Sequence, residues 1–251
     1  RRVGDMGEHE IKVQIEAQQC PFITRLYGAF ETDTHLFMVM ERCAGDFFTH
    51  MTMHFGTKPY VQNITIYAAQ VLVAVEQLHA LGYAYRDLKP ENVLMRVDGK
   101  LVLSDFGLAS PMDPHQRSTH LCGTAEYLSP EMVSREGYGY MTDLWSYGVL
   151  VYEMLTFATP FANEYEHQND PKNAKLFNKI TTFKQINFPQ RARVPFIAQQ
   201  FITALLVAEP KKRLGAGDNM GDYQSIRAHP FFEGVDWKAL IDGFSGPTLE
   251  P

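Results

Sequence analysis

The chain has 251 residues, 45% of them hydrophobic, and a formal net charge of −6, which suits one large domain or two lobes sharing a core. The acidic balance argues against a nucleic-acid binder, which would carry a basic face, and no run of about 18 apolar residues exists to cross a membrane. The three cysteines are widely spaced and odd in number, so a reducing compartment and a cytoplasmic location are expected.

The first half of the chain predicts a few strands among helices. Pro21 should end the first helix, because the residue before a proline is disfavoured in helical geometry. Gly82 stands where a C-terminal helix cap belongs, and Asp98-Gly99 is a strong hairpin signal. Helices are expected within residues 1–20, over 47–54 and over 60–81, and strands over 22–30, 36–41, 93–95 and 101–103.

The second half predicts mainly helices. Residues 109–130 are rich in Ser, Thr and Pro, as in a regulatory loop, while residues 141–156 are apolar nearly all round, which is typical of a buried helix. A polar insert at 163–173, amphipathic helices up to His229 and a loop-like end after Phe232 follow. Strands followed by helices give the fold class α+β, with a small β-containing lobe and a helical lobe.

Two stretches carry groups suited to phosphoryl transfer. They are Tyr85-Arg86-Asp87-Leu88-Lys89-Pro90-Glu91-Asn92 and Asp105-Phe106-Gly107. Such a reaction needs an oriented hydroxyl, neutralised phosphate charge and metal ions held by hard oxygen ligands. Asp87 suits the hydroxyl, Lys89 the transferred phosphate, and Asn92 and Asp105 suit Mg²⁺. Each stretch alone also fits a surface loop or a tight turn. Their order around a predicted hairpin favours the interpretation that they form a catalytic site.

With these motifs in this order, the chain resembles the eukaryotic protein kinase family. Ser129-Pro130-Glu131 with Arg213 matches an ion pair of that family, and Asp143 matches the buried aspartate that braces the catalytic loop. Gly123-Thr124 resembles the Ser/Thr kinases, in which Thr124 would hydrogen-bond toward Asp87 and Lys89. Resemblance to the AGC group, similar to cyclic-nucleotide-dependent and ribosomal-S6-type kinases, is carried by Tyr85, Leu121 to Thr124, Arg213 to Gly217 and His229 to Phe232.

The resemblance implies a bilobal kinase fold with ATP and Mg²⁺ as cofactors. Residues 1–41 would be a partial N-lobe, 42–233 the hinge and helical C-lobe, and 234–251 the start of a C-terminal tail. Met40 would be the gatekeeper, with backbone bonds from Glu41 and Cys43 to adenine. Leu94 and Ser104 would lie around the adenine and metal site.

Three acids match positions where basophilic members of the group hold substrate arginines. They are Asp46, Glu91 and Glu153. Carboxylates bind arginine in a bidentate manner, so basic peptide substrates are expected. The alternatives are that Asp46 caps a helix and that Glu91 belongs to the generic loop.

The chain departs from the family pattern in two places near its start. It lacks the glycine-rich loop and the strand lysine that hold the ATP phosphates, and Lys12 is predicted to lie on a helix, where it cannot replace that lysine. We therefore interpret the chain as a fragment that alone would have little or no activity. A gapless count puts Ile11 at the family's helix glutamate, with Glu10 one residue away, about 100° around the helix.

A third departure is His120, which stands where the group carries an activating phosphothreonine. Either Thr119 or Ser118 takes the phosphate, or the loop orders without one. Arg86 would be the group that grips such a phosphate.

The favoured interpretation is a monomeric protein Ser/Thr kinase domain that transfers the γ-phosphoryl group of Mg-ATP to basic peptides. The alternative is a pseudokinase or scaffolding module, favoured by the missing N-terminal elements and the Ile11 mismatch. A small-molecule kinase is disfavoured by Ser129-Pro130-Glu131 and by the peptide-directed acids.

Overall fold

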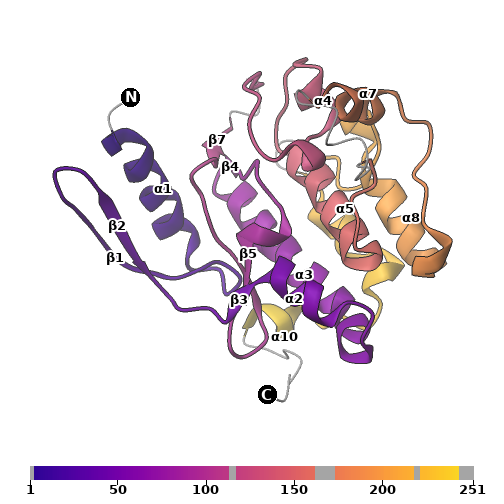
Figure 1. The fold of residues 1–251 in the computed structure, drawn as a ribbon, viewed down its shortest axis with the longest axis horizontal. Helices are drawn as coiled ribbons and strands as arrows, with labels where there is room; N and C mark the ends of the chain where they lie inside the picture. The colour runs from indigo at the N-terminus through magenta and orange to yellow at the C-terminus, as the bar shows by residue number, and fades with distance from the viewer. Residues whose placement is uncertain (1–2, 113–116, 162–172, 218–220, 243–251) are drawn as a thin grey trace. The chain divides into compact units, whose positions relative to one another are not determined.

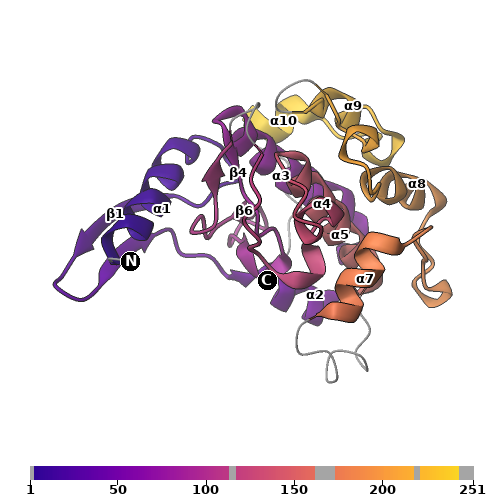
Figure 2. The same cartoon turned by 90° about the horizontal axis from the view of Figure 1, so that it is seen from above.

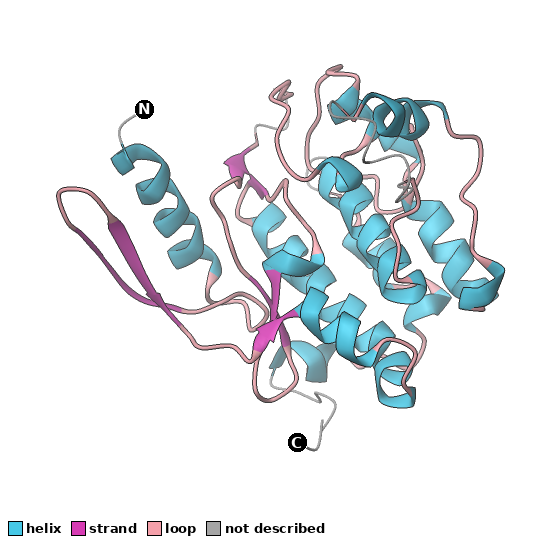
Figure 3. Cartoon of the chain, in the orientation of Figure 1, coloured by secondary structure: helices cyan, strands magenta, loops and turns pink. Residues whose placement is uncertain are grey.

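The computed structural model describes residues 3–112, 117–161, 173–217 and 221–242. The chain forms two compact units. Unit 1 consists of Arg1–Tyr85, Pro90–Pro111 and Gly234–Pro251, and unit 2 of Arg86–Lys89 and Met112–Glu233. Small sheets and many helices confirm the predicted α+β class (Figure 3).

Unit 1 begins with a helix and a hairpin that lie side by side (Figures 1 and 2). Helix α1 is Val3–Ala17, and strands β1 (Leu26–Glu31) and β2 (Leu36–Met40) pair antiparallel. One face of the hairpin meets α1, where a Cβ on Gly7 would lie 2.1 Å from the Leu36 side chain. Because side chains alternate across a strand, the opposite face carries Phe30 and Phe37, which stack at 5.0 Å and are exposed.

The rest of unit 1 is built around α3, most of whose length is buried. The hairpin β5–β6 packs on α3, and the Gln70 side chain accepts a hydrogen bond from the Leu101 N–H at 2.9 Å. The strand order is β3-β5-β6 in one sheet, and β4 pairs with β7 in another. The elements are β3 Gly45–Asp46, α2 Phe47–His54, α3 Lys58–Ala80, β4 Tyr83–Ala84, the 3-10 helix Pro90–Asn92, β5 Val93–Met95, β6 Leu101–Leu103, β7 Ser110–Pro111 and α10 Trp237–Asp242.

Unit 2 is helical and is organised around α5, which is buried along almost its whole length. Helix α8 runs beside it in both views (Figures 1 and 2). Gly148 allows this close approach, because a Cβ there would lie 2.9 Å from Leu205. The helices are α4 Pro130–Val133, α5 Met141–Thr156, α7 Ala174–Thr182, α8 Phe196–Leu205 and α9 Tyr223–Arg227, with 3-10 helices at Ala125–Tyr127, Gln190–Ala192, Pro210–Lys212 and Pro230–Phe232.

Most of the predicted elements are confirmed, and two predictions are wrong. The segment before Leu26 is not a strand, because Phe22 and Thr24 hydrogen-bond through their backbones to Leu103 and their side chains are buried. The chain after Phe232 is not only loop, because Asp236 accepts a hydrogen bond from the Ala239 N–H and begins α10. The polar insert lies outside the described residues except for Asn173, as does the tail beyond Asp242.

Among the described residues, no helix combines the length and apolarity needed to cross a bilayer. The three-part division into N-lobe, C-lobe and tail is based on family roles, whereas the two units follow packing. It stays a prediction.

Candidate functional site

In unit 2, three polar side chains form a closed cluster. The Thr124 hydroxyl donates to Asp87 Oδ1 at 2.8 Å and accepts from Lys89 Nζ at 2.9 Å. Lys89 Nζ also lies 3.2 Å from Asp87 Oδ2. The hydrogen bonds expected of Thr124 are therefore present, and they fix the positions of the Asp87 and Lys89 side chains.

The loop that carries Asp87 is held by the buried helix α5. Asp143, in the first turn of α5 and fully buried, accepts a hydrogen bond from the Arg86 N–H at 2.8 Å. Arg86 has a φ of 71°, in the left-handed region that costs a non-glycine residue free energy. Gly123 approaches from the other side, because a Cβ there would lie 2.4 Å from the Arg86 carbonyl oxygen. The bracing role expected of Asp143 has the matching geometry.

A buried ion pair lies deeper in unit 2. Arg213 Nη1 lies 2.9 Å from Glu131 Oε1, and Nη2 lies 3.1 Å from Oε2. The guanidinium also donates to the Val207 carbonyl and lies over the Trp145 ring at 5.3 Å. The ion pair expected between the Ser-Pro-Glu segment and Arg213 is present.

In unit 1, Asn92 and Asp105 are the predicted metal ligands. Asn92 is buried, and its backbone carbonyl oxygen accepts from both the N–H and the hydroxyl of Ser104 at 2.9 Å. Asp105 is exposed, with a φ of 55°, and its carboxylate accepts from the Gly107 N–H at 3.3 Å. An amide and an exposed carboxylate are hard oxygen donors and fit Mg²⁺.

Glu10 of α1 faces the Asp-Phe-Gly turn. Its Oε2 would lie 3.5 Å from a Cβ placed on Gly107. Burial raises the pKa of Glu10, and the nearby charge of Asp105 raises it further. Of the two candidates, Ile11 and Glu10, it is Glu10 whose carboxylate lies beside this turn. Two carboxylates this close favour a cation beside them.

The predicted adenine-binding segment follows β2. The Glu41 N–H donates to the Arg25 carbonyl at 2.9 Å, and the Ala44 N–H donates to the Met95 carbonyl at 2.7 Å. Between them, the Glu41 carbonyl and the Cys43 N–H make no hydrogen bond within the described part of the chain. Burial and the charge of Glu41 raise the pKa of the Cys43 thiol.

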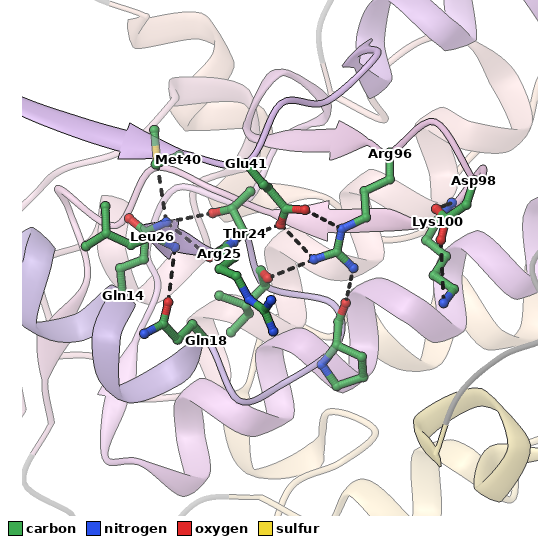
Figure 4. Close-up of polar contacts among 12 residues, drawn as sticks. Gln14, Gln18, Thr24, Arg25, Leu26, Met40, Glu41, Arg96, Asp98 and Lys100 are labelled. Carbon is green, nitrogen blue, oxygen red and sulfur yellow. Dashed lines mark hydrogen bonds and ion pairs between the residues drawn. The ribbon is translucent and has the colours of Figure 1, made fainter. Parts of the chain in front are cut away.

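The two apolar residues predicted around adenine are both partly open. Met40 is 41% exposed, and its sulfur accepts from Gln14 Nε2 at 3.3 Å (Figure 4). Leu94 lies in β5, opposite Asp46 of β3 and Val102 of β6, and is half-buried. Neither is a fully buried core residue.

Arg96 makes a contact that sequence reasoning missed. Its guanidinium binds the Glu41 carboxylate through Nε and Nη2, each at 2.7 Å (Figure 4). The two residues are 55 positions apart, so no local pattern could have paired them.

The three acids predicted to read substrate arginines differ in their surroundings. Asp46 caps α2 by accepting from the Thr49 N–H at 2.7 Å; burial alone would raise its pKa, but the hydrogen bonds from Thr49 outweigh this and lower it. Glu91 is exposed. Glu153 is only 8% exposed and accepts from the Tyr127 hydroxyl, so a direct contact of this acid with substrate is not supported. Asp46 is thus a helix cap, as the alternative interpretation expected.

Tyr138 is a second residue that sequence reasoning missed, and it holds residues 118–120 of the loop expected to be regulatory. Its buried hydroxyl accepts from Arg86 Nη1 at 3.1 Å and donates to the His120 carbonyl at 2.6 Å. Ser118 and Tyr138 also exchange backbone hydrogen bonds at 3.0 and 2.9 Å, and Thr119 is exposed.

Comparison with known proteins agrees with this geometry. The family described as "Protein kinase domain" matches residues 5–232. The chain is 38% identical over 227 residues to ribosomal protein S6 kinase alpha-4 of Homo sapiens, covering 89% of this chain and 28% of that protein. It is 38% identical over 248 residues to serine/threonine-protein kinase SCH9 of Saccharomyces cerevisiae, covering 98% and 28%, and 37% identical over 249 residues to serine/threonine-protein kinase sck2 of Schizosaccharomyces pombe, covering 98% and 36%.

The chain thus spans roughly a third of the length of these curated relatives. The expected similarity to ribosomal-S6-type kinases is confirmed. By the match across most of its length, this chain belongs to the protein kinase domain family.

Proposed function

We propose that this chain is the catalytic part of a cytoplasmic protein Ser/Thr kinase that transfers the γ-phosphoryl group of Mg-ATP to hydroxyls in basic peptides. The observation that carries the proposal is the cluster in which Thr124 joins Asp87 to Lys89. It holds a base and a cation in fixed positions, as phosphoryl transfer requires.

Each residue has a role in the proposed reaction. Asp87 orients the substrate hydroxyl and accepts its proton as the oxygen attacks the γ-phosphorus. Lys89 offsets negative charge on the transferred group, and Thr124 fixes the positions of Asp87 and Lys89 by hydrogen-bonding to both. Asn92 and Asp105 would hold Mg²⁺, which when bound supplies positive charge to the phosphates.

The adenine would be bound by backbone groups. The Glu41 carbonyl can accept from the exocyclic amine, and the Cys43 N–H can donate to the ring nitrogen, since neither has a hydrogen bond within the described residues. Met40, Leu94 and Ser104 would line the adenine and metal site around them.

A basic substrate would be read by carboxylates. Glu91 is exposed, and Asp46 keeps its negative charge over a wide pH range because its pKa is lowered by the cap of α2, against the opposing effect of burial. The net charge of −6 favours the approach of cationic peptides.

Asp105→Asn in the full-length protein tests the proposal. We expect phosphorylation of an arginine-containing peptide to fall at least a thousandfold, because a neutral amide is a much weaker Mg²⁺ ligand. Asp98→Asn is the matched control, since it removes an exposed carboxylate from the turn after β5. Unchanged turnover in Asp105→Asn would remove the metal role.

A pseudokinase or scaffolding module is the alternative function for the same fold. It predicts that the wild-type protein binds Mg-ATP or a partner without producing phosphopeptide. Peptide phosphorylation by the wild-type protein that is lost in Asp105→Asn would exclude it.

A further inference from the structure

Arg96 joins three segments of unit 1 that are far apart in sequence. Its guanidinium binds the Glu41 carboxylate in a bidentate manner and donates through Nη1 to the Pro21 carbonyl at 2.6 Å (Figure 4). Arg96 itself is anchored in the β5–β6 hairpin, where its N–H donates to the Lys100 carbonyl at 2.8 Å. It therefore connects this hairpin both to the segment after α1 and to the segment after β2.

The ion pair is charged and mostly shielded from water. The exposed fractions are 22% for the Arg96 side chain and 13% for that of Glu41. Burial alone would raise the pKa of Glu41, but the hydrogen bonds and charge of Arg96 and the Arg25 N–H outweigh it and lower the pKa. The carboxylate is thus held as an anion from two sides, with Glu41 Oε1 also accepting from the Arg25 N–H at 2.8 Å.

These bonds control a short stretch of backbone. Residues 41–44 are fixed at one end by the Glu41 side chain and N–H, and at the other by the hydrogen bond from Ala44 to Met95, the neighbour of Arg96. The Glu41 carbonyl and the Cys43 N–H lie between these anchors without hydrogen bonds of their own in the described chain. Their directions therefore depend on what holds Glu41.

We propose that Arg96 is a positioning residue for purine selection, acting through Glu41. The inference rests on the proposed function, in which these two backbone groups meet the adenine. A fixed acceptor and a fixed donor match the amine and ring nitrogen of adenine, whereas guanine presents an acceptor and a donor in the opposite order. A site that leaves polar groups unpaired with the wrong base discriminates strongly against it.

Arg96→Ala is the first test, with nucleotide selectivity as the readout. We expect the KM for ATP to rise roughly tenfold, equivalent to about 1.4 kcal/mol, while kcat changes little and the preference for ATP over GTP falls by a similar factor. Arg25→Ala is the matched control, because Arg25 borders the same open cavity and hydrogen-bonds Glu41 only through its backbone N–H and carbonyl, which the substitution keeps. The charge of the Arg25 side chain has the smallest effect on the pKa of Glu41.

Chemical rescue separates positioning from general destabilisation. A cavity of about 460 Å³ is bordered by both Glu41 and Arg96 and opens to solvent. Millimolar guanidinium should therefore enter the Arg96→Ala protein and restore ATP selectivity, while urea at the same concentration should not, because it carries no charge. Arg96→Lys, which keeps the charge but loses the fork, should retain an intermediate selectivity.

An Arg96→Ala protein with the ATP preference of Arg25→Ala would overturn the inference. If Arg96→Ala fails to fold, Arg96→Lys and Glu41→Gln decide, and wild-type selectivity in both would overturn it equally. The two proposals fail separately. Loss of purine selectivity in a protein that never phosphorylates peptide refutes the kinase proposal alone, whereas normal peptide phosphorylation with unchanged selectivity refutes the role of Arg96 alone.

Discussion

The candidate catalytic residues of the two units differ in how their polar groups are satisfied. In unit 2, Asp87, Lys89 and Thr124 bind one another, and Asp143 binds the loop that carries them. In unit 1, Asp105 is exposed beside Glu10, and the Glu41 carbonyl and Cys43 N–H make no hydrogen bond among the described residues.

This difference separates preorganisation from complementarity to a ligand. Groups that already hold one another need no rearrangement when charge develops in a transition state, which is where enzymes gain most. Groups without partners gain more from a ligand, because that ligand supplies the interactions they lack. In the proposed function, unit 2 would thus supply the reacting groups and unit 1 the nucleotide and metal ligands.

The largest expected effect comes from breaking the buried ion pair between Arg213 and Glu131 in unit 2. Arg213→Met leaves the Glu131 carboxylate buried without its cation. A buried charge without a partner costs about 3–5 kcal/mol, so the free energy of unfolding should fall by that amount in a urea titration.

The double variant Glu131→Leu with Arg213→Met is the control. Because it removes both charges, it should recover most of the lost stability. A double variant no more stable than Arg213→Met would mean that the loss came from packing on Trp145 and not from the unpaired charge.

A smaller effect is expected from opening the cluster of Asp87, Lys89 and Thr124. Thr124→Ala removes the hydroxyl that joins Asp87 to Lys89. We expect kcat for peptide phosphorylation to fall by roughly 10- to 100-fold, which is about 1.4–2.7 kcal/mol, with the KM for ATP unchanged.

Thr124→Ser keeps the hydroxyl and should stay within a few-fold of wild type. Equal loss in the serine and alanine variants would show that the Thr124 methyl group, and not its hydrogen bonds, matters. Steady-state kinetics of both variants would distinguish the two.

The division between the units also explains which elements the sequence could predict. Helix 141–156 and strands 93–95 and 101–103 were predicted to the residue, because strong apolar patterns and an Asp-Gly turn mark them locally. The strand expected to begin at residue 22 begins only at Leu26. The backbones of Phe22 and Thr24 instead hydrogen-bond to Leu103, some eighty residues later. Local pattern cannot report such a partner.

The same limit applies to the candidate site. The Asp87, Asn92 and Asp105 motifs are contiguous in sequence and were found there, and the contacts of Thr124 followed from the family resemblance. Arg96 and Tyr138 were missed, because their role depends on Glu41 and Arg86 and these lie 55 and 52 positions away. Glu10 needed the geometry of Gly107 to be separated from Ile11.

His50 of α2 extends the comparison, because it is a buried polar group of unit 1 to which our proposal assigns no ligand. Its Nε2 has no hydrogen-bond partner in the described chain, and it lies among His54, Tyr60 and Tyr67. Burial, with a smaller contribution from His54, lowers the pKa of His50 from 6.5 to about 4.

Below pH 6.5, His50 therefore binds a proton in the unfolded chain, whereas in the folded chain it does so only near pH 4. Stability should fall as the pH drops through this window, by about 1–2 kcal/mol once the partial exposure of His50 is allowed for. In His50→Phe the fall should be shallower, as measured by urea titrations at pH 7, 5.5 and 4.5. His54→Gln is the matched control, and a slope identical to wild type in His50→Phe would contradict the assignment.

The smallest expected effect tests how the loop expected to be regulatory is held against Arg86. Tyr138→Phe keeps the buried ring but removes the hydroxyl that joins Arg86 to the His120 carbonyl. A net hydrogen-bond contribution of about 0.5–1.5 kcal/mol to the order of this loop predicts a roughly two- to twelvefold loss of peptide phosphorylation, with ATP binding unchanged. Phosphatase treatment, Ser118→Ala and Thr119→Ala should leave wild-type activity intact if this tyrosine orders the loop, since Arg86 is then already engaged by a neutral group. The opposite result would be activity that disappears on phosphatase treatment and in Thr119→Ala, yet survives Tyr138→Phe. It would show that a phosphate on Thr119, and not the Tyr138 hydroxyl, orders the loop.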